Sequence, residues 1–447
     1  MDNAATTSAA TASNDATSND ATTGCPAAHT PAGFSFFDRE YLDNPGAALA
    51  WARESRPVFY NDDSDYWVVT RHDDVKAVFS QFNLFSAAIT LTPVTPPSEE
   101  AAAQLGAYGF APCPVLADSD PPMHRQYRRL NAPAFMPDRI DPLAPYIRET
   151  TNAYIDRFVD RGHADLVADM LWDIPCLVAL QFLGIPEEDV DTVRALATSM
   201  TEFVWGRPSP EEQVRAADGL GRFWAMGDRV ITKLKELDDP PGWLGHAITM
   251  QRMHPDVISD TWLQTNVMGG AMAAHETTTN ATANAVVTLL RNRDQWDRLC
   301  ADPSLIPGAV EECLRLNPSI AAWRRIAKED VEVGGVTIPA GGKILMVIAS
   351  ANQDDAVFDD PERFDIDRDA KAHIAFGAGT HMCLGNHLAR LEMVIYLEEL
   401  TRRLPHMTLD QQEFHFVPNT SFRGPDALHV SWDVEKNPIP AGPEAAA

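Results

Sequence analysis

One short stretch, FGAGTHMCLGNHLAR from Phe376 to Arg390, constrains this chain more than any other part of it. Cys383 lies between a glycine-rich turn and a run from Gly385 to Leu400 whose apolar residues recur at helical spacing. Glycines at 377, 379 and 385 let a backbone pass close to a flat ligand. Backbone N–H groups converge where a helix begins, and they stabilise the thiolate form of a thiol placed there. We therefore expect Cys383 to be a metal ligand or a nucleophile. The alternative is a small buried hydrophobic residue, which is what most cysteines are.

The spacing Phe376-x-x-Gly379-x-His381-x-Cys383-x-Gly385 resembles the haem-ligand loop of the cytochrome P-450 family. The resemblance implies one mainly α domain with minor β-sheets, in which haem b (iron protoporphyrin IX) is buried between a long central helix and the Cys383 loop. A single thiolate ligand pushes electron density onto the iron and favours O–O cleavage. The implied cofactor contacts in this loop are Phe376, Gly377, His381, Cys383 and Gly385, with Cys383 as the metal ligand.

Composition limits what else the chain does. The net charge of −28 argues against sequence-independent nucleic-acid binding, which needs a basic face. Residues 1–30 are rich in Ala, Thr and Ser and predict a disordered tail, 31–435 the haem domain, and 436–447 a second tail. No run of 18 apolar residues occurs, and no secretory signal is present. We expect a soluble, cytoplasmic protein without a membrane partner.

The longest uninterrupted helical pattern runs from Asp256 to Leu290. Small residues in its middle would let a flat ligand lie against the backbone, and Glu276 and Thr277 supply an acid and a hydroxyl beside it. Alone, such a pair is usually part of a solvated helix face. The segment resembles the oxygen-activating helix of the family, which implies that Glu276 and Thr277 relay protons and that Ala273 contacts the haem. The family usually has Gly where this chain has Ala274.

Basic residues elsewhere could hold the two haem propionates. His124 and Arg128 are four residues apart and share a helix face, although a solvated basic face explains that spacing as well. The resemblance implies propionate contact for both, and for Arg325, with Arg324 as the alternative. Glu312 and Arg315 resemble the family's E-x-x-R pair, and Arg363 matches the later arginine that completes its network.

The substrate pocket is the least constrained part. The segment from Ala87 to Leu116 is long and weakly periodic, and in the family this region covers the substrate. Residues 414–417 and 428–432 are expected to form a hairpin whose turn enters the pocket. Pro45–Glu54 is expected to form one helix, and 331–338 one strand. The predicted pocket residues are apolar or aromatic: Phe203, Met268, Met272, Ile320, Ala321, Trp323 and Phe422.

The resemblance implies a monooxygenase that inserts one oxygen atom from O2 into a small apolar or aromatic substrate, by hydroxylation or O-dealkylation. No flavin, nicotinamide or iron–sulfur motif occurs, so we expect electrons from a separate ferredoxin and its NAD(P)H-dependent reductase, with Arg125 and Arg129 as docking residues. A peroxygenase of the same fold is one alternative, although those relatives replace the acid–alcohol pair with Arg and Pro. A non-catalytic haem protein that binds a gas is the other.

Overall fold

The computed structural model describes residues 34–436, so the predicted tail 1–30 lies outside the described residues, and so does the tail 436–447 except for Lys436. The helices are α1 Arg39–Asp43, α2 Pro45–Ala48, α3 Ala50–Ser55, α4 His72–Ser80, α5 Glu99–Ala107, α6 Met123–Asn131, α7 Pro137–Ile140, α8 Ala144–Ile155, α9 Ile174–Leu183, α10 Val190–Trp205, α11 Pro210–Lys235, α12 Gly242–Met253, α13 Asp260–Arg291, α14 Arg293–Ala301, α15 Ile306–Leu316, α16 Ile348–Ala351 and α17 Asn386–Arg403. The strands are β1 Val58–Asn61, β2 Tyr66–Val69, β3 Phe85–Ser86, β4 His163–Asp165, β5 Trp323–Ala327, β6 Val331–Val333, β7 Val336–Ile338, β8 Lys343–Met346, β9 Thr408–Leu409 and β10 His429–Ser431. The prediction of a mainly α fold with minor β-sheets is confirmed.

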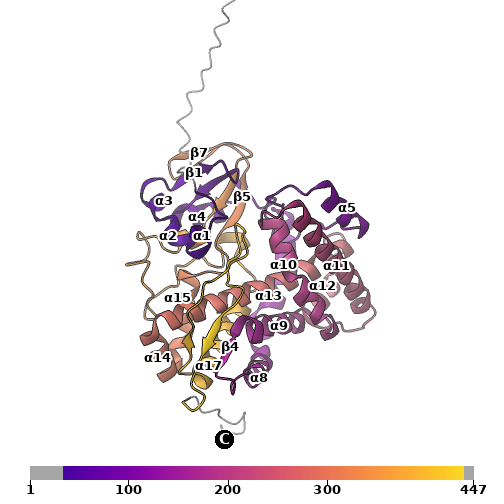
Figure 1. Cartoon of the computed structure of the whole chain (residues 1–447). Helices are drawn as coiled ribbons and strands as arrows, with labels where there is room; N and C mark the ends of the chain where they lie inside the picture. Colours follow the sequence, from indigo (N-terminus) through magenta and orange to yellow (C-terminus); the bar gives the residue numbers. More distant parts are fainter. Residues whose placement is uncertain (1–33, 437–447) are drawn as a thin grey trace, which may run out of the picture.

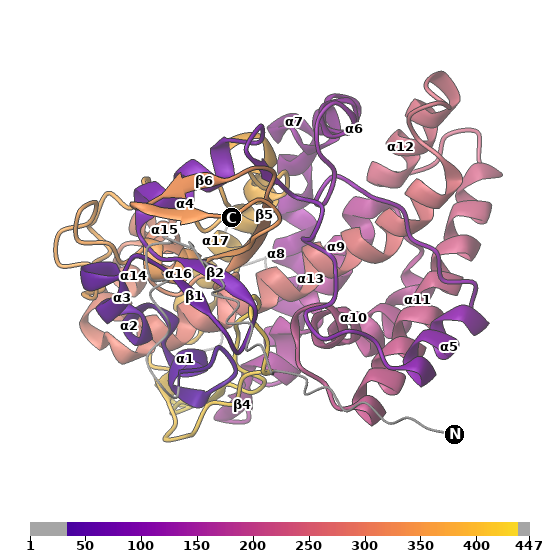
Figure 2. The ribbon, with the colours of Figure 1, turned by 90° about the horizontal axis from the view of Figure 1, so that it is seen from above.

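The long helix α13 runs through the molecule from the helical part, where α10, α11 and α12 lie, to the part that contains the strands, where α14 and α15 lie (Figures 1 and 2). Ser259 caps its start, since the Ser259 side chain accepts a hydrogen bond of 3.0 Å from the backbone N–H of Trp262. Helices α9, α10 and α11 pack against it from one half, and α15 and α17 from the other. Buried residues therefore occur all round α13, which explains why it has no polar face.

The main sheet has the strand order β1-β2-β8-β5-β3, in which β2 and β8 are parallel and the other pairs antiparallel. In this register Arg324 and Arg325 pair with Leu345 and Ile344, so their side chains leave opposite faces of the sheet. This alternation decides which of the two arginines can reach the interior.

Three local expectations are wrong. Pro45–Glu54 forms two helices that meet at Leu49, and 331–338 forms a hairpin because Gly334 and Gly335 turn the chain at positive φ (55° and 80°). The expected hairpin of 414–417 and 428–432 is reduced to a single bridge between Phe416 and Pro425. Strand β10 pairs instead with β4 and β9, because proline has no N–H for a regular ladder near Pro418 and Pro425.

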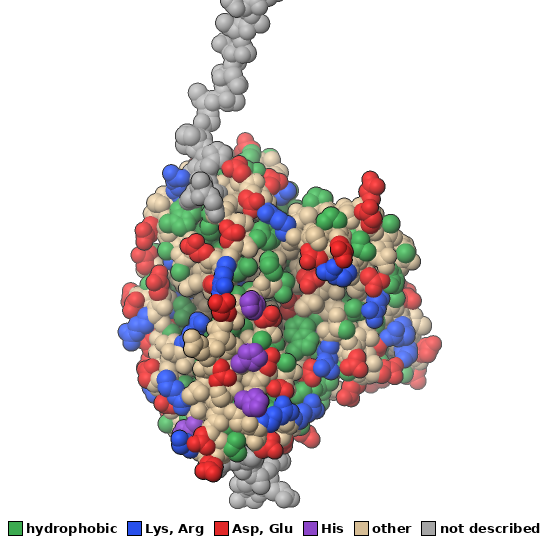
Figure 3. Space-filling view, in the orientation of Figure 1, with side chains coloured by type: hydrophobic (Ala, Val, Ile, Leu, Met, Phe, Trp, Pro, Cys, Tyr) green, Lys and Arg blue, Asp and Glu red, His purple; other side chains and the backbone are tan. Residues whose placement is uncertain are grey.

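The segment from Ala87 to Leu116 is not structureless, because it contains α5, which packs against α11. Its flanks reach the interior through Leu91, Val115 and Leu116. Acidic side chains are spread over the molecular face in Figure 3 without gathering into one patch. In residues 34–436 no helix is both long enough and apolar enough to cross a membrane.

Candidate active site

The Cys383 loop is fixed by its backbone. Gly377 and Gly379 have φ values of 71° and 67°, and a Cβ on Gly379 would come within 2.8 Å of the Phe79 carbonyl oxygen, so glycine is required there. The backbone N–H of Cys383 donates a hydrogen bond of 3.0 Å to the Phe376 carbonyl oxygen. Gly385 has an ordinary backbone conformation, and a Cβ added there would meet Cys383 Sγ at 3.9 Å and no other heavy atom within 4 Å among the described residues. Gly385 therefore leaves open space beside the sulfur atom.

The Cys383 thiol opens onto a cavity of about 370 Å³ that lies between α13 and the loop. Burial raises the pKa of this thiol, and the backbone N–H of Gly385 and the charges of Arg128 and Arg390 lower it by less. The expected stabilisation of the thiolate by the helix start is thus present but outweighed by desolvation. A bound metal cation reverses the balance, because it deprotonates a coordinating thiol.

One edge of the cavity is basic and contains unpaired donors. Arg325 Nη2 and both ring nitrogens of His124 are buried and have no hydrogen-bond partner among the described residues. The His124 ring stacks on His381 at 3.9 Å between centroids. Burial, together with Arg128 and Arg325, lowers the pKa of His124 to about 4, and burial and Arg325 lower that of His381 to about 3. Buried donors without acceptors cost free energy, so this edge is built for an anionic group.

The two neighbouring arginines have different surroundings. Arg324 donates to the carbonyl oxygens of Thr92 and Thr90, at 2.8 and 2.5 Å, and does not line the cavity. Arg325 lines the cavity. Arg128 also lines it, and its Nη1 donates to the carbonyl oxygens of Thr380 and Met382, which stabilises the Cys383 loop.

Helix α13 forms the opposite wall. Ala273, Ala274 and Thr277 line the cavity, and Thr277 Oγ1 donates a hydrogen bond of 2.6 Å to the Ala273 carbonyl oxygen without interrupting the helix. Glu276 does not line the cavity, although sequence reasoning placed it beside the ligand. It is buried on the α10 side, where Thr201 Oγ1 donates to it, and burial raises its pKa to about 7.

The predicted pocket residues divide into two sets. Met272, Ile320, Trp323 and Phe422 line the cavity, whereas Phe203, Met268 and Ala321 are buried elsewhere in the core. Sequence reasoning missed several cavity-lining aromatic side chains, because the helix faces that meet the cavity follow from tertiary packing and not from periodicity alone. These are Phe135, Phe182, Trp205, Trp243 and Trp262, and the acid Glu392 was missed in the same way.

Behind the loop, Glu312 and Arg315 form a fully buried pair at 2.7 Å. The prediction of Arg363 as the third member is wrong, because its side chain is 65% exposed and, within residues 34–436, forms an ion pair with Asp365 alone, at 3.6 Å. Arg368 takes its place, with Nε 3.1 Å from Glu312 Oε1. Only the Arg363 carbonyl oxygen joins the network, as an acceptor from Arg315.

These features fit a haem. A thiol that faces an apolar cavity provides a ligand for iron, and unpaired donors at one edge provide partners for two carboxylates. The cavity walls otherwise carry few charges, as an apolar macrocycle requires.

Comparisons with known proteins agree. Residues 243–426 match the family model for cytochrome P-450. Cytochrome P-450 105A3 of Streptomyces carbophilus is 34% identical over 84% of this chain and 89% of its own. The crystal structure of an intact type IV self-sufficient cytochrome P-450 monooxygenase is 50% identical with a TM-score of 0.90, over 93% of this chain and 55% of that chain. Cytochrome P-450 CREJ in complex with (4-ethylphenyl) dihydrogen phosphate is 34% identical with a TM-score of 0.86, over 90% and 99% of the two chains.

The fold and the thiol-lined cavity thus define an oxidoreductase of the monooxygenase class whose cofactor contains haem iron. The chain belongs to the cytochrome P-450 family.

Proposed function

We propose that this chain is a haem b monooxygenase that inserts one oxygen atom from O2 into a small, uncharged, aromatic or apolar substrate by hydroxylation or O-dealkylation. The observation that carries the proposal is the position of Cys383 Sγ at one wall of an apolar cavity, opposite the hydroxyl-bearing face of α13. Bound at Cys383, the haem supplies the activation of dioxygen.

The residues that would hold the haem lie around this cavity. Cys383 would bind the iron, and His124, Arg128, Arg325 and His381 would surround the propionates. Arg325 Nη2 and the His124 ring supply unpaired donors, and Arg325 is preferred to Arg324, whose guanidinium is engaged by carbonyl oxygens. The macrocycle would lie against Ala273, Phe376, Gly377 and Gly385, which also line the cavity.

Glu276 and Thr277 would handle protons on the α13 side. Glu276 holds a proton on its carboxyl group near neutral pH because burial raises its pKa to about 7. Thr277 Oγ1 is on the cavity side and can pass a proton by rotating away from the Ala273 carbonyl oxygen. Glu276 must leave Thr201 before it can hydrogen-bond to a group in the cavity, so small movements of α10 would control the transfer.

The substrate class follows from the charges and rings of the cavity. Among the described lining residues, the arginines are Arg128 and Arg325, both at the proposed propionate edge. No cation is then left for an anionic substrate such as the phosphate ester bound by cytochrome P-450 CREJ. Trp205, Trp323 and Phe422 form an aromatic corner, with Trp205 5.8 Å from Trp323 and 4.7 Å from Phe422 between ring centroids.

Electrons would come from an iron–sulfur donor, which we propose to be a separate ferredoxin with an NAD(P)H-dependent reductase. The type IV neighbour is self-sufficient, and this chain spans 55% of its length, so a donor linked to the same chain is the alternative. Arg125 and Arg129 are exposed on α6, near the Cys383 loop that Arg128 contacts, and suit an acidic donor.

The test has two stages. The reduced protein should give a strongly red-shifted Soret band with carbon monoxide, and 4-ethylphenol should shift the spin state of the ferric protein far more than its phosphate ester does. A band typical of histidine-ligated haem would refute thiolate ligation by Cys383. Turnover with hydrogen peroxide alone, at the rate obtained with a ferredoxin system, would favour the peroxygenase. Binding of carbon monoxide without any spin-state response to organic compounds would favour a gas-binding protein.

A further inference from the structure

Glu392 lies on the helix that follows Cys383 and lines the cavity. Leu388, Ala389, Glu392 and Met393 of α17 share the helix face that borders the cavity, as their spacing requires. Glu392 is the only carboxylic acid among the described lining residues. Burying an ionisable side chain in an otherwise apolar helix face costs free energy. Its presence there therefore indicates a role.

The surroundings of Glu392 favour its neutral form. The side chain is 1% exposed, and the Tyr396 hydroxyl donates a hydrogen bond of 2.7 Å to Glu392 Oε2. No lysine or arginine forms an ion pair with it in the described part of the chain. Burial raises the pKa of Glu392 to about 8, against a smaller lowering by the Tyr396 hydrogen bond.

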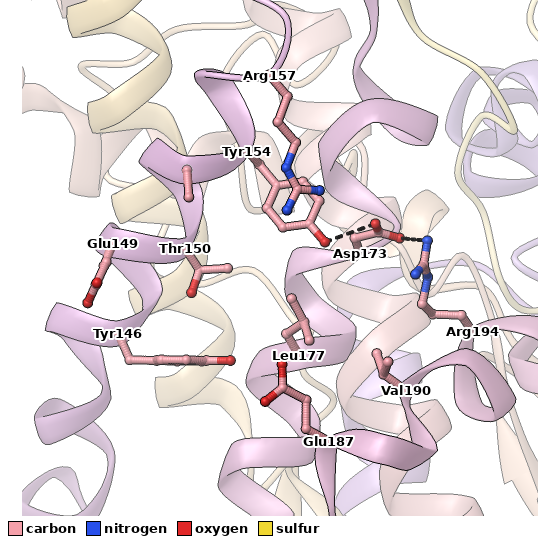
Figure 4. A pocket seen from close by; sticks show the side chains of 11 residues that line it. Tyr146, Glu149, Thr150, Tyr154, Arg157, Asp173, Leu177, Glu187, Val190 and Arg194 are labelled. Atoms are coloured by element: carbon pink, nitrogen blue, oxygen red, sulfur yellow. Dashed lines mark hydrogen bonds and ion pairs between the residues drawn. The ribbon is translucent and has the colours of Figure 1, made fainter. Parts of the chain in front are cut away.

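A second tyrosine connects this pair to the surface. Tyr146 lies on helix α8, which packs against α17, and it is close enough to Tyr396 for its charge to raise the pKa of Tyr396. Tyr146 borders an open cleft of about 450 Å³, and its ring extends across the cleft toward Leu177 and Glu187 in Figure 4. Glu392 at the cavity, Tyr396 next to it and Tyr146 at the cleft therefore lie in sequence between the cavity and the surface. Transfer between the two tyrosine hydroxyls would need a bridging water molecule.

We propose that Glu392 exchanges a proton with solvent, by way of Tyr396 and Tyr146, when the cofactor gains an electron. This inference rests on the proposed function, because it requires haem at Cys383. One electron from the donor would lower the oxidation state of the haem iron by one. One proton from solvent would form an O–H bond on an ionised Glu392 carboxylate, and no other bond would change. The added electron favours protonation, since negative charges repel strongly in a site of low dielectric constant.

Other titratable groups around the cavity and α17 do not account for such a response. The pKa values of His124 and His381 are lowered to about 4 and 3, so both rings stay neutral. Two other acids come near this pH range: Glu276 on α13, with a pKa raised to about 7, and Asp118, next to the lining residue Ala117, with a pKa raised to about 6. The other described charged groups on or facing α17 are ion-paired or permanently charged. They are Glu311 with His373 and Arg390, Glu312 with Arg315 and Arg368, Glu398 and Glu399 with Arg148, Glu399 also with Arg402, His387 with Asp141, and Arg403 with Asp156, besides the cavity arginines Arg128 and Arg325.

The test is the midpoint potential of the haem-loaded protein from about pH 6 to about pH 9.5, the range that brackets Glu276 and Glu392. In the wild type the midpoint potential should fall as pH rises above about 8. The fall should be at most 59 mV per pH unit, which corresponds to a tenfold change in the reduction equilibrium constant. Glu392→Gln, which keeps the size of the side chain, should remove this fall. Glu276→Gln should leave it in place. A Glu392→Gln profile that matches the wild type would overturn the proposal.

Two further variants keep the test decisive if Glu392→Gln does not retain haem. In the wild type the hydrogen bond from Tyr396 lowers the pKa of Glu392. Tyr396→Phe removes this bond and should therefore move the pH at which the potential begins to fall to a higher value. A fall that begins at the wild-type pH would refute the role of the pair. Tyr146→Phe should leave the potentials unchanged and slow their re-equilibration after a pH jump severalfold; an unchanged rate would refute the route through Tyr146. A missing red-shifted carbon monoxide band in the wild type would count against the proposed function instead.

Discussion

Thr201 on α10 donates a hydrogen bond of 2.6 Å to Glu276 on α13, and this contact holds the acid outside the cavity that its neighbour Thr277 lines. The acid and the alcohol are adjacent in sequence but lie on different sides of one helix. Both groups are buried, and no cation shares the hydrogen bond among the described residues. Helix α10 is therefore hydrogen-bonded directly to the acid for which we propose a role in proton transfer.

Thr201→Val should shift the pH dependence of turnover. Burial raises the pKa of Glu276 to about 7, and the Thr201 hydrogen bond lowers it, so losing this bond moves the pKa upward. A hydrogen bond worth about 1 kcal/mol corresponds to less than about one pH unit. The alkaline limb of the rate profile should move to higher pH in Thr201→Val. It should stay in place in Thr282→Val, which removes a buried hydroxyl bonded only to the Thr278 carbonyl oxygen. An alkaline limb at the same pH in the wild type and both variants would show that the Thr201 hydrogen bond does not set the pKa of Glu276.

Glu276→Gln should change how stability depends on pH. The folded-state pKa of Glu276 is raised above the unfolded value, so its stabilising contribution is complete below about pH 4.5 and is lost as pH rises toward 7. The shift corresponds to about 3 kcal/mol at most. Urea unfolding at several pH values should show a smaller loss of stability between pH 4.5 and 7 in Glu276→Gln than in the wild type. Parallel curves would show that the pKa of Glu276 is not raised in the folded protein.

The sequence predicted the parts of the site whose identity depends on local backbone requirements. Cys383 and the two positive-φ glycines, Gly377 and Gly379, lie where the loop needs them, and α13 follows its helical pattern closely. Choices between neighbouring side chains were not predictable. Phe203 packs in the core while Trp205, two residues later, lines the cavity, because the orientation of α10 is set by its packing against α11 and α13. Arg368 takes the place expected for Arg363, because the folding of their loop brings the Arg368 side chain to Glu312 and leaves that of Arg363 largely exposed.

Arg368→Ala should destabilise the protein and Arg363→Ala should not. Arg368 adds a charged hydrogen bond to the buried Glu312 and also donates to the Asp359 carbonyl oxygen, so its loss should cost about 1.5–3 kcal/mol. Arg363 is largely exposed and contacts one carboxylate at 3.6 Å, which is worth less than about 1 kcal/mol. Urea unfolding midpoints of the two variants provide the comparison. Equal effects would mean that the network around Glu312 does not depend on Arg368.

Thr277→Ala should uncouple electron consumption from product formation. Its hydroxyl is on the α13 wall of the cavity, whereas the Thr282 hydroxyl is buried in the helix and outside the cavity. We expect Thr277→Ala to consume NAD(P)H with hydrogen peroxide as the main product. Thr282→Ala should keep the wild-type ratio of product to NAD(P)H. A wild-type ratio in Thr277→Ala would exclude the proposed proton transfer through this residue.

Phe422→Leu should weaken the binding of aromatic substrates, whereas Phe203→Leu should not. Both side chains are 5% exposed, so the two substitutions remove similar buried rings. Phe422 lines the cavity and contacts Trp205 with its ring centroid at 4.7 Å, whereas Phe203 lies outside the cavity lining. The loss of an aromatic contact costs about 0.5–1.5 kcal/mol, which is roughly a two- to tenfold increase in Kd. Spin-state titrations with 4-ethylphenol give this Kd, and urea unfolding shows whether each variant is destabilised by the change of shape, which should cost about 1 kcal/mol in both. A larger effect of Phe203→Leu than of Phe422→Leu on Kd would mean that the substrate binds beside Phe203 and not in the aromatic corner.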